Sequence, residues 1–197
     1  MQKSDNRLTP KDLINIGIFT AIYFVVAFAV AMIGYIPIFI PLQSMAVPLA
    51  GGIPMMLMLT KVRKFGAMLI LAVVVGAVYT VMGSGIWLLP IGIVSALAAE
   101  FIVKSGKYQS AKKAVLAYGV FCLAVFGNYM PIFFSRDAYR SFVIESGYGE
   151  EYADALIRYL PNWIAPVLVA ACFAFGILGG LLGRAVLKKH FDRAGMA

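Results

Sequence analysis

The chain has 197 residues, 62% of them hydrophobic, and its formal net charge is +8. This length and composition are typical of one compact membrane domain and leave no room in the loops for a soluble catalytic domain. The basic residues do not gather in a soluble module. We therefore expect their excess to reflect membrane topology and attraction to anionic lipid headgroups, with no nucleic-acid partner.

Six apolar stretches with few or no charges divide the sequence. A helix needs about 20 apolar residues to cross the hydrocarbon core of a bilayer, and these stretches have about that length. The predicted fold class is all-α, a polytopic membrane protein with six transmembrane helices in a single domain over residues 1–197. The predicted helices cover roughly residues 12–38, 44–60, 65–82, 86–104, 113–134 and 162–187, with an outer loop over 135–161.

The basic residues are distributed unevenly between the two sides of this arrangement. All but three of the 17 lie at one set of helix ends and connections. The exceptions are Arg136, Arg140 and Arg158, in or beside the outer loop. Because basic residues resist translocation, the rich side is predicted to be cytoplasmic, and six crossings then place both termini there.

The first two predicted helices carry clear local signals. Thr9 is a fair N-cap and Pro10 a fair first helical residue. Residues 35–43 contain two prolines and no charge, so we expect this segment to dip back into the outer face of the membrane. Two prolines and two glycines over residues 48–54 predict a kink or break in the second helix. Such a break either frees backbone groups for a ligand or is only a packing kink.

The two later outer connections differ in length. Little more than Gly83-Ser84-Gly85 joins the third and fourth helices, which predicts a tight antiparallel hairpin. The loop over 135–161 is long and holds five of the nine acidic residues, together with aromatic residues that give it an apolar underside. We expect a short amphipathic helix lying as a lid over the mouth of the bundle, and a solvated loop without a role is the alternative.

Small residues recur at the four-residue spacing that lets helix backbones approach closely in a membrane. Gly17 and Ala21 have this spacing in the first helix. In the sixth helix, Gly176 pairs with Gly180 and a second pair ends at Gly183. The pattern serves either packing within the bundle or a docking face for another membrane subunit.

The helices carry no recognisable set of catalytic or metal-ligating side chains. We therefore expect no enzyme, no metal site and no cofactor. The single histidine, His190, lies in the basic tail, and Cys122 and Cys172 are expected to be apolar packing residues. Glu100, an acid within an apolar stretch, is expected to pair with Lys104 and to serve structure or a subunit contact rather than a ligand.

Neutral polar and aromatic side chains collect in the outer half of the predicted bundle. Asn128 needs hydrogen-bond partners from neighbouring helices or from a ligand, whereas the aromatic residues have an alternative role as interface anchors. Arg136 is expected to reach inward from the lid toward an anionic group. Together these groups suit a small, planar, hydrogen-bonding molecule. The candidate substrate-binding residues are Gln43, Tyr79, Trp87, Asn128, Tyr129, Arg136 and Trp163.

Three segments carry a resemblance to a known group of membrane proteins: LTPKDLINIGIFTAIYFV near the N-terminus, GIVSALAAEFIVKSGKYQS in the fourth helix, and GGLLGRAVLKKHFDRAGMA at the C-terminus. With six predicted helices and no ATPase of its own, the chain resembles the substrate-binding S components of energy-coupling factor (ECF) vitamin transporters. More specifically, it resembles their Trep_Strep (treponeme–streptococcal) branch.

The resemblance implies a subunit that captures a small water-soluble vitamin or heterocyclic precursor outside the bacterial plasma membrane. The partners it implies are a transmembrane coupling subunit and two cytoplasmic ATPase subunits. Gly17 and Ala21 match the positions that contact the coupling subunit in the group, with Gly17 in place of the usual Ala. The loop after the first helix and the loop over 135–161 match segments that commonly gate the pocket. The alternatives are a membrane scaffold or assembly subunit without a ligand, and a stand-alone small-molecule facilitator.

Overall fold

The computed structural model describes residues 7–83 and 87–188, and every regular element within these ranges is a helix. The all-α prediction is therefore confirmed for the described part of the chain. Lys3, Ser84, Gly85, His190 and the rest of the basic tail from residue 189 lie outside the described residues. In chain order the elements are α1 (Pro10–Ala31), η1 (Met32–Tyr35), η2 (Pro37–Phe39), α2 (Ile40–Lys61), α3 (Ala67–Val81), α4 (Leu88–Ser105), α5 (Ala111–Phe121), η3 (Cys122–Tyr129), α6 (Met130–Phe134), α7 (Arg136–Val143), η4 (Ile144–Tyr148), α8 (Glu150–Tyr159), η5 (Asn162–Ile164) and α9 (Ala165–Val186).

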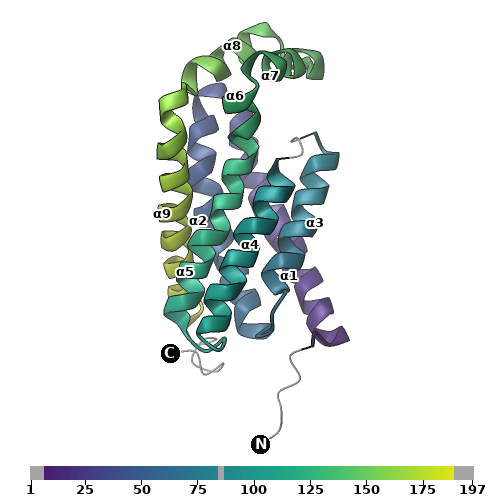
Figure 1. Ribbon diagram of the computed structural model, residues 1–197, viewed down its shortest axis with the longest axis vertical. Coiled ribbons are helices and arrows are strands. Elements are labelled where there is room, and N and C mark those ends of the chain that lie inside the picture. Colours follow the sequence, from purple (N-terminus) through teal and green to yellow (C-terminus); the bar gives the residue numbers. More distant parts are fainter. Residues whose placement is uncertain (1–6, 84–86, 189–197) are drawn as a thin grey trace, which may run out of the picture.

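The long helices stand side by side as a bundle, with α7 and α8 lying across its upper end (Figure 1). The start of α1 and the end of α9 are both at the lower end of the bundle, as are the α2–α3 and α4–α5 connections. Those connections and the helix ends beside them carry the basic side chains Lys61, Arg63, Lys64, Lys104 and Lys107. The basic end of the described bundle is therefore opposite the end that α7 and α8 cover.

Among the described residues, five helical stretches are long and apolar enough to cross a membrane: Pro10–Tyr35, Pro37–Lys61, Leu88–Ser105, Ala111–Phe134 and Asn162–Val186. The sixth, α3, is also apolar but has only 15 residues. Its length is about 22 Å, against a hydrocarbon core of about 30 Å. The five stretches agree with a polytopic membrane protein, while the sixth crossing and the orientation of the termini stay predictions.

Several predicted helix boundaries are wrong. The first helix was expected to reach residue 38, but α1 ends at Ala31 and the chain continues through the short turns η1 and η2. The helical stretch as a whole ends at Tyr35, because Ile36 precedes Pro37 and is held in an extended conformation. The second helix begins at Ile40 rather than 44. It runs to Lys61 as one helix with Pro48 and Pro54 inside it, so the helix does not break there, and the expected kink stays a prediction.

The later boundaries are closer to those predicted. The helix expected over 113–134 begins at Ala111 and tightens into a 3₁₀ helix, η3, before it resumes as α6. Pro131 lies at the start of α6, and its missing N–H weakens the α-helical hydrogen bonding of the turn that precedes it. The ends of α3, α4 and α9 differ by no more than three residues from the predicted 65–82, 86–104 and 162–187.

The start of α1 is fixed as the sequence predicted. The Thr9 backbone N–H donates to the Asp12 carboxylate at 2.8 Å, and the Thr9 hydroxyl accepts the Asp12 N–H at 3.4 Å. This reciprocal capping satisfies backbone donors that the first turn leaves unpaired. Lys64 Nζ also contacts the same carboxylate at 2.8 Å and thereby ties the start of α1 to the α2–α3 connection.

Glycines let α2 and α9 pack backbone against backbone. A Cβ added to Gly52 would overlap the Gly179 carbonyl, and one added to Gly183 would lie 2.6 Å from the Gly52 carbonyl oxygen. Gly176 approaches the Gly119 backbone of α5 in the same way. The small residues of α9 therefore serve packing within the bundle, which decides between the two roles that the sequence left open for them.

Glu100 does not form the predicted pair with Lys104. The Glu100 side chain is 1% exposed, and its Oε1 accepts the backbone N–H of Met68 at 2.7 Å. It thus satisfies a backbone donor in the first turn of α3, where a negative charge is also favoured by the helix dipole. Lys104 instead extends over the Phe65 ring, with Nζ 5.6 Å from the ring centroid. Glu100 holds α4 against α3.

Candidate ligand-binding site

Residues 136–159 form a lid across the upper end of the bundle. The sequence predicted one short amphipathic helix here, but the lid contains two, α7 and α8, connected through η4. Gly147 and Gly149 have φ angles of 87° and 84°, in a region that side chains with a Cβ disfavour. These two glycines turn the chain between the helices, and a single continuous helix is therefore not possible.

Apolar packing and one ion pair give the lid its shape. Val143, Ala153 and Leu156 are buried and pack on Tyr129 and other residues at the upper end of the bundle. On the outer surface, Arg140 Nε donates to Asp154 Oδ1 at 2.6 Å and links α7 to α8. The hydrogen bond from Arg140 holds the pKa of Asp154 below its ordinary value. The lid is therefore a packed unit rather than a solvated loop.

Tyr152 fastens the lid to the segment that follows α1. Its hydroxyl donates a hydrogen bond to the Gly34 carbonyl at 2.7 Å. Burial raises the pKa of Tyr152 to about 12, so the hydroxyl keeps its proton at neutral pH. The Tyr148 ring stacks on Tyr152 and on Tyr35, with centroids 4.9 Å and 6.3 Å apart. The lid and η1 thus meet through three tyrosines.

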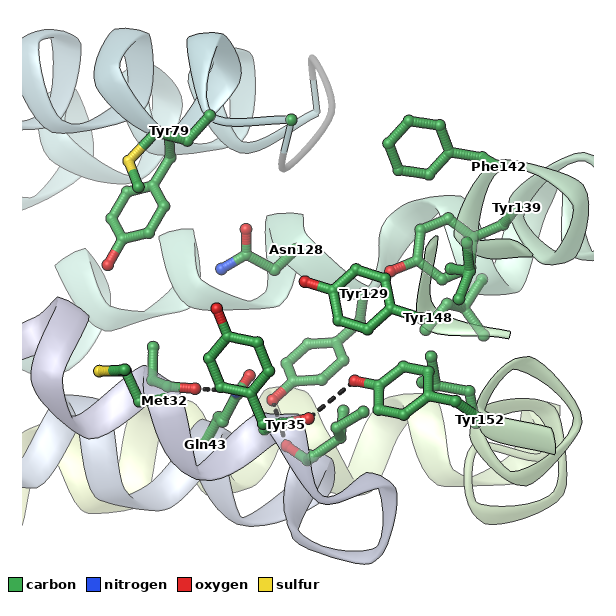
Figure 2. A pocket seen from close by; sticks show the side chains of 18 of the residues that line it. Met32, Tyr35, Gln43, Tyr79, Asn128, Tyr129, Tyr139, Phe142, Tyr148 and Tyr152 are labelled. Carbon is green, nitrogen blue, oxygen red and sulfur yellow. Dashed lines mark hydrogen bonds between the residues drawn. The ribbon is translucent and has the colours of Figure 1, made fainter. Parts of the chain in front are cut away.

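Beneath the lid lies a cavity of about 310 Å³, which we call the upper chamber. Its walls come from the end of α1 and η1, the start of α2, the end of α3, the helical segment around η3, and the underside of the lid (Figure 2). None of the described residues that line it is charged, and eight of them are aromatic. A cavity of this size and lining suits a small, flat organic molecule.

Two amide side chains face this chamber. Gln43 Nε2 donates to the Ala31 carbonyl at 2.6 Å, and Gly34 packs so closely on the Gln43 amide that a Cβ there would overlap it. Asn128 lies on η3, between Tyr79 and Gln43 in the view of Figure 2. The Asn128 Oδ1 is buried and has no hydrogen-bond partner among the described residues. Because a buried acceptor without a partner is costly, this oxygen is placed to accept a hydrogen bond from a ligand.

A smaller cavity of about 70 Å³, the lower chamber, adjoins the upper one. The two share Ala31, Gln43, Tyr79 and Asn128 as lining residues. The other described residues around the lower chamber are apolar apart from Tyr23, and they come from α1 to α5 and η3. The polar groups of the combined cavity are thus concentrated in the upper chamber and at the boundary between the two.

Four of the seven candidate binding residues line the upper chamber: Gln43, Tyr79, Asn128 and Tyr129. They come from α2, α3 and η3, which are distant in sequence, so the fold brings them together. Tyr129 is almost completely buried, and its hydroxyl donates to the Ile40 carbonyl at 2.9 Å. This bond ties η3 to the start of α2, and the Tyr129 ring forms part of the chamber wall.

The other three candidates line neither described chamber. Trp163 is 70% exposed, and Trp87 is 44% exposed and stacks on Phe134 with centroids 6.2 Å apart. Both tryptophans fit the alternative role of interface anchors. Arg136 was expected to reach inward, but its guanidinium donates to the Leu160 carbonyl within the lid region. Position along each helix indicated the depth of these side chains but not the direction in which they point.

Sequence reasoning did not select the residues that close the chamber. Tyr35, Tyr148 and Tyr152 line it and hold the lid. Gly34 provides the carbonyl that accepts the Tyr152 hydrogen bond, and its lack of a Cβ leaves space for the Gln43 amide. Two features of the sequence could have indicated them: the segment after α1 has no charge, and the outer loop carries aromatic residues on one side. Two apolar segments at the same end of a bundle are expected to pack on each other.

Gly17 and Ala21, the candidate contacts for a coupling subunit, lie on the outward surface of α1. Both are exposed, and a Cβ added to Gly17 would meet no other atom within 4 Å. Larger apolar side chains on the same surface include Ile14, Ile18 and Val25, which are 63%, 51% and 62% exposed. Gly17 and Ala21 are therefore free to contact lipid or another protein.

The fold and the cavity define a helical integral membrane protein with a lidded, uncharged chamber at one end. Within the described residues, no cluster of three or more His, Cys, Asp or Glu side chains forms a possible metal site. The chain belongs to the family described as hypothetical bacterial integral membrane protein (Trep_Strep), which matches residues 10–193. No curated protein and no solved structure matches it significantly.

Proposed function

We propose that this protein is the substrate-binding S component of an ECF-type importer in the bacterial plasma membrane. It captures a small water-soluble vitamin or heterocyclic precursor from outside. A transmembrane coupling subunit and two ATPase subunits then drive its delivery to the cytoplasm. The protein itself performs no chemical reaction. The observation that carries this proposal is the lidded upper chamber, with the unpartnered Asn128 oxygen in its wall.

The charge distribution supports an outward-facing chamber. The described helix ends and connections at the lower end carry most of the basic residues, whereas the lid end carries Arg136, Arg140 and Arg158. By the positive-inside rule the lower end is cytoplasmic and the lid faces outside. A chamber that opens on the outer side suits capture of an external solute, and it would be on the wrong side for an exporter's substrate.

Mass spectrometry of small molecules released from the denatured protein tests the proposal. Protein purified from its natural host is expected to carry one dominant compound at near-stoichiometric amount. The variant Ala31→Phe fills the boundary between the two chambers and is expected to release far less of it. Ala98→Phe is the matched control, because Ala98 is exposed on the surface of α4. It is expected to retain the compound.

The same preparation separates the alternative functions. A scaffold would release no compound from either the wild type or the control, and this result would overturn the proposal. Gentle purification is also expected to recover a membrane partner and ATPase subunits in fixed ratio. A facilitator that works alone would retain its solute without these partners, and transport by the isolated chain in liposomes would identify it.

A further inference from the structure

The cavity has two parts of different chemistry. The upper chamber, about 310 Å³, has aromatic walls and polar groups, while the lower chamber, about 70 Å³, is lined mostly by apolar residues. Asn128 and Tyr79 line both parts, so polar groups mark the boundary between them. A ligand that fills the whole cavity must therefore present a hydrogen-bonding part and an apolar part in a fixed order.

The lower chamber is suited to hydrocarbon rather than to water. It is larger than the roughly 30 Å³ that one water molecule occupies, yet most of its walls offer no hydrogen bonds. Gly92, Ala72 and Ala124 all line it, and a Cβ added to Gly92 would lie in ordinary van der Waals contact with the Ala124 and Ala72 methyl groups, at 3.9 Å and 4.0 Å. Small side chains on facing helices thus leave room for a substituent of a few carbon atoms.

The described walls provide no counter-charge for an ionised ligand. No Lys, Arg, Asp or Glu is among the described residues that line either chamber. The nearby arginines of the lid line neither chamber: Arg140 pairs with Asp154, and Arg136 donates to the Leu160 carbonyl, although its Nε has no partner among the described residues. A charged group drawn into this cavity would lose its water without gaining a partner of opposite charge, which strongly disfavours binding.

We propose that the site selects an uncharged ligand with two parts: a planar, hydrogen-bonding ring and a short apolar substituent. The ring lies among the tyrosines of the upper chamber and donates a hydrogen bond to Asn128 Oδ1. The substituent passes between Asn128 and Tyr79 into the lower chamber. This inference rests on the proposed function and names the substrate class within it, because many water-soluble vitamins are charged and the site excludes them.

A panel of matched probes tests both halves of the inference by calorimetry on the purified protein in detergent. Three neutral parent rings are used: uracil, nicotinamide and pterin. Each is measured unsubstituted, as an ethyl derivative and as a carboxylate derivative. For a parent ring that binds, the ethyl derivative is expected to bind at least several-fold more tightly, since each buried methylene contributes about fourfold. The carboxylate derivative is expected to bind at least about tenfold more weakly than its parent.

A cavity-filling pair of variants locates the substituent. Gly92→Ala adds one methyl group inside the lower chamber, and Val94→Ile adds one carbon on the lipid-facing surface of the same helix, where Val94 is 68% exposed. Gly92→Ala is expected to remove most of the gain from the ethyl group while leaving the affinity for the parent ring within about twofold. Val94→Ile is expected to change neither.

The outcomes separate the two proposals. If carboxylate derivatives bind as tightly as their parents, or if Gly92→Ala leaves the ethyl gain intact, the two-part neutral ligand is wrong while the importer function stands. If no probe binds and the protein releases no compound on denaturation, the proposed function fails and this inference fails with it. If no probe binds but a compound is released, its charge and structure decide the inference directly.

Discussion

Asn128 is the residue at which stability and binding are expected to conflict. Its buried Oδ1 has no partner among the described residues, so the empty chamber leaves an acceptor unsatisfied. Asn128→Leu removes that acceptor, and the unfolding temperature of the ligand-free protein is expected to stay the same or rise. Ligand affinity is expected to fall by about 5- to 150-fold, corresponding to about 1–3 kcal/mol for a lost buried hydrogen bond.

Asn162→Leu is the matched control for this prediction, because Asn162 is exposed on η5 and lines neither chamber. It should leave affinity unchanged. Thermal unfolding and calorimetry on both variants provide the two measurements. Unchanged affinity in Asn128→Leu would exclude Asn128 from ligand contact. A lower unfolding temperature for the ligand-free variant would show that the Asn128 side chain has a partner within the protein.

The hydroxyl of Tyr152 makes a second prediction at the residue scale. Tyr152→Phe keeps the ring that stacks on Tyr148 but removes the hydrogen bond to Gly34. A net loss of about 1 kcal/mol is expected for that bond, so the lid should open more often and the ligand should dissociate about fivefold faster. Stopped-flow dissociation measures this effect. Tyr159→Phe, at an exposed position on the same helix, should leave the rate unchanged.

The close packing of α2 against α9 depends on glycines, which have no Cβ at the contact. A Cβ at Gly179 would overlap the Pro48 carbonyl and lie 3.0 Å from Leu49 Cα, and these are backbone atoms that cannot rotate away. Gly179→Ala is therefore expected to destabilise the protein by about 1–3 kcal/mol or more, measured by unfolding in mixed micelles. Gly17→Ala provides the comparison, since its Cβ would meet open space. Equal stability of the two variants would show that α2 and α9 can separate at little cost.

Helix ends were predictable where capping residues, charges or glycines mark them, as at Thr9 before α1 and around α3. The two-helix lid was not, because the turn depends on the φ angles of Gly147 and Gly149, which composition does not reveal. For the site, sequence position gave the depth of each side chain along its helix. It did not give the direction, since a lipid-facing surface and a packed interior are both apolar. Asn128 and Trp163 were therefore both placed in the outer half of the bundle, although only Asn128 lines the chamber.

In the whole molecule, the ligand-binding cavity and the surface proposed to contact a coupling subunit are in different places. The chambers lie beneath the lid, whereas Gly17 is on the outward surface of α1, where a larger side chain would meet no atom of this chain. Gly17→Leu is therefore expected to preserve folding and ligand affinity. In the proposed importer it is expected to abolish uptake, because a bulky side chain would hold the α1 surface away from a partner helix that needs close approach.

Uptake in liposomes that contain the coupling and ATPase subunits, with calorimetry on the isolated variant, tests this separation. Val94→Leu, on the exposed surface of α4, adds bulk away from α1 and should leave both uptake and affinity unchanged. Normal uptake in Gly17→Leu would remove α1 as the docking surface. Equal loss of uptake and affinity would mean that the substitution at Gly17 distorts the binding cavity, which would count against α1 as a docking surface. Loss of uptake alone is the result that a passive scaffold or an independent facilitator does not predict, because neither depends on a subunit at this surface.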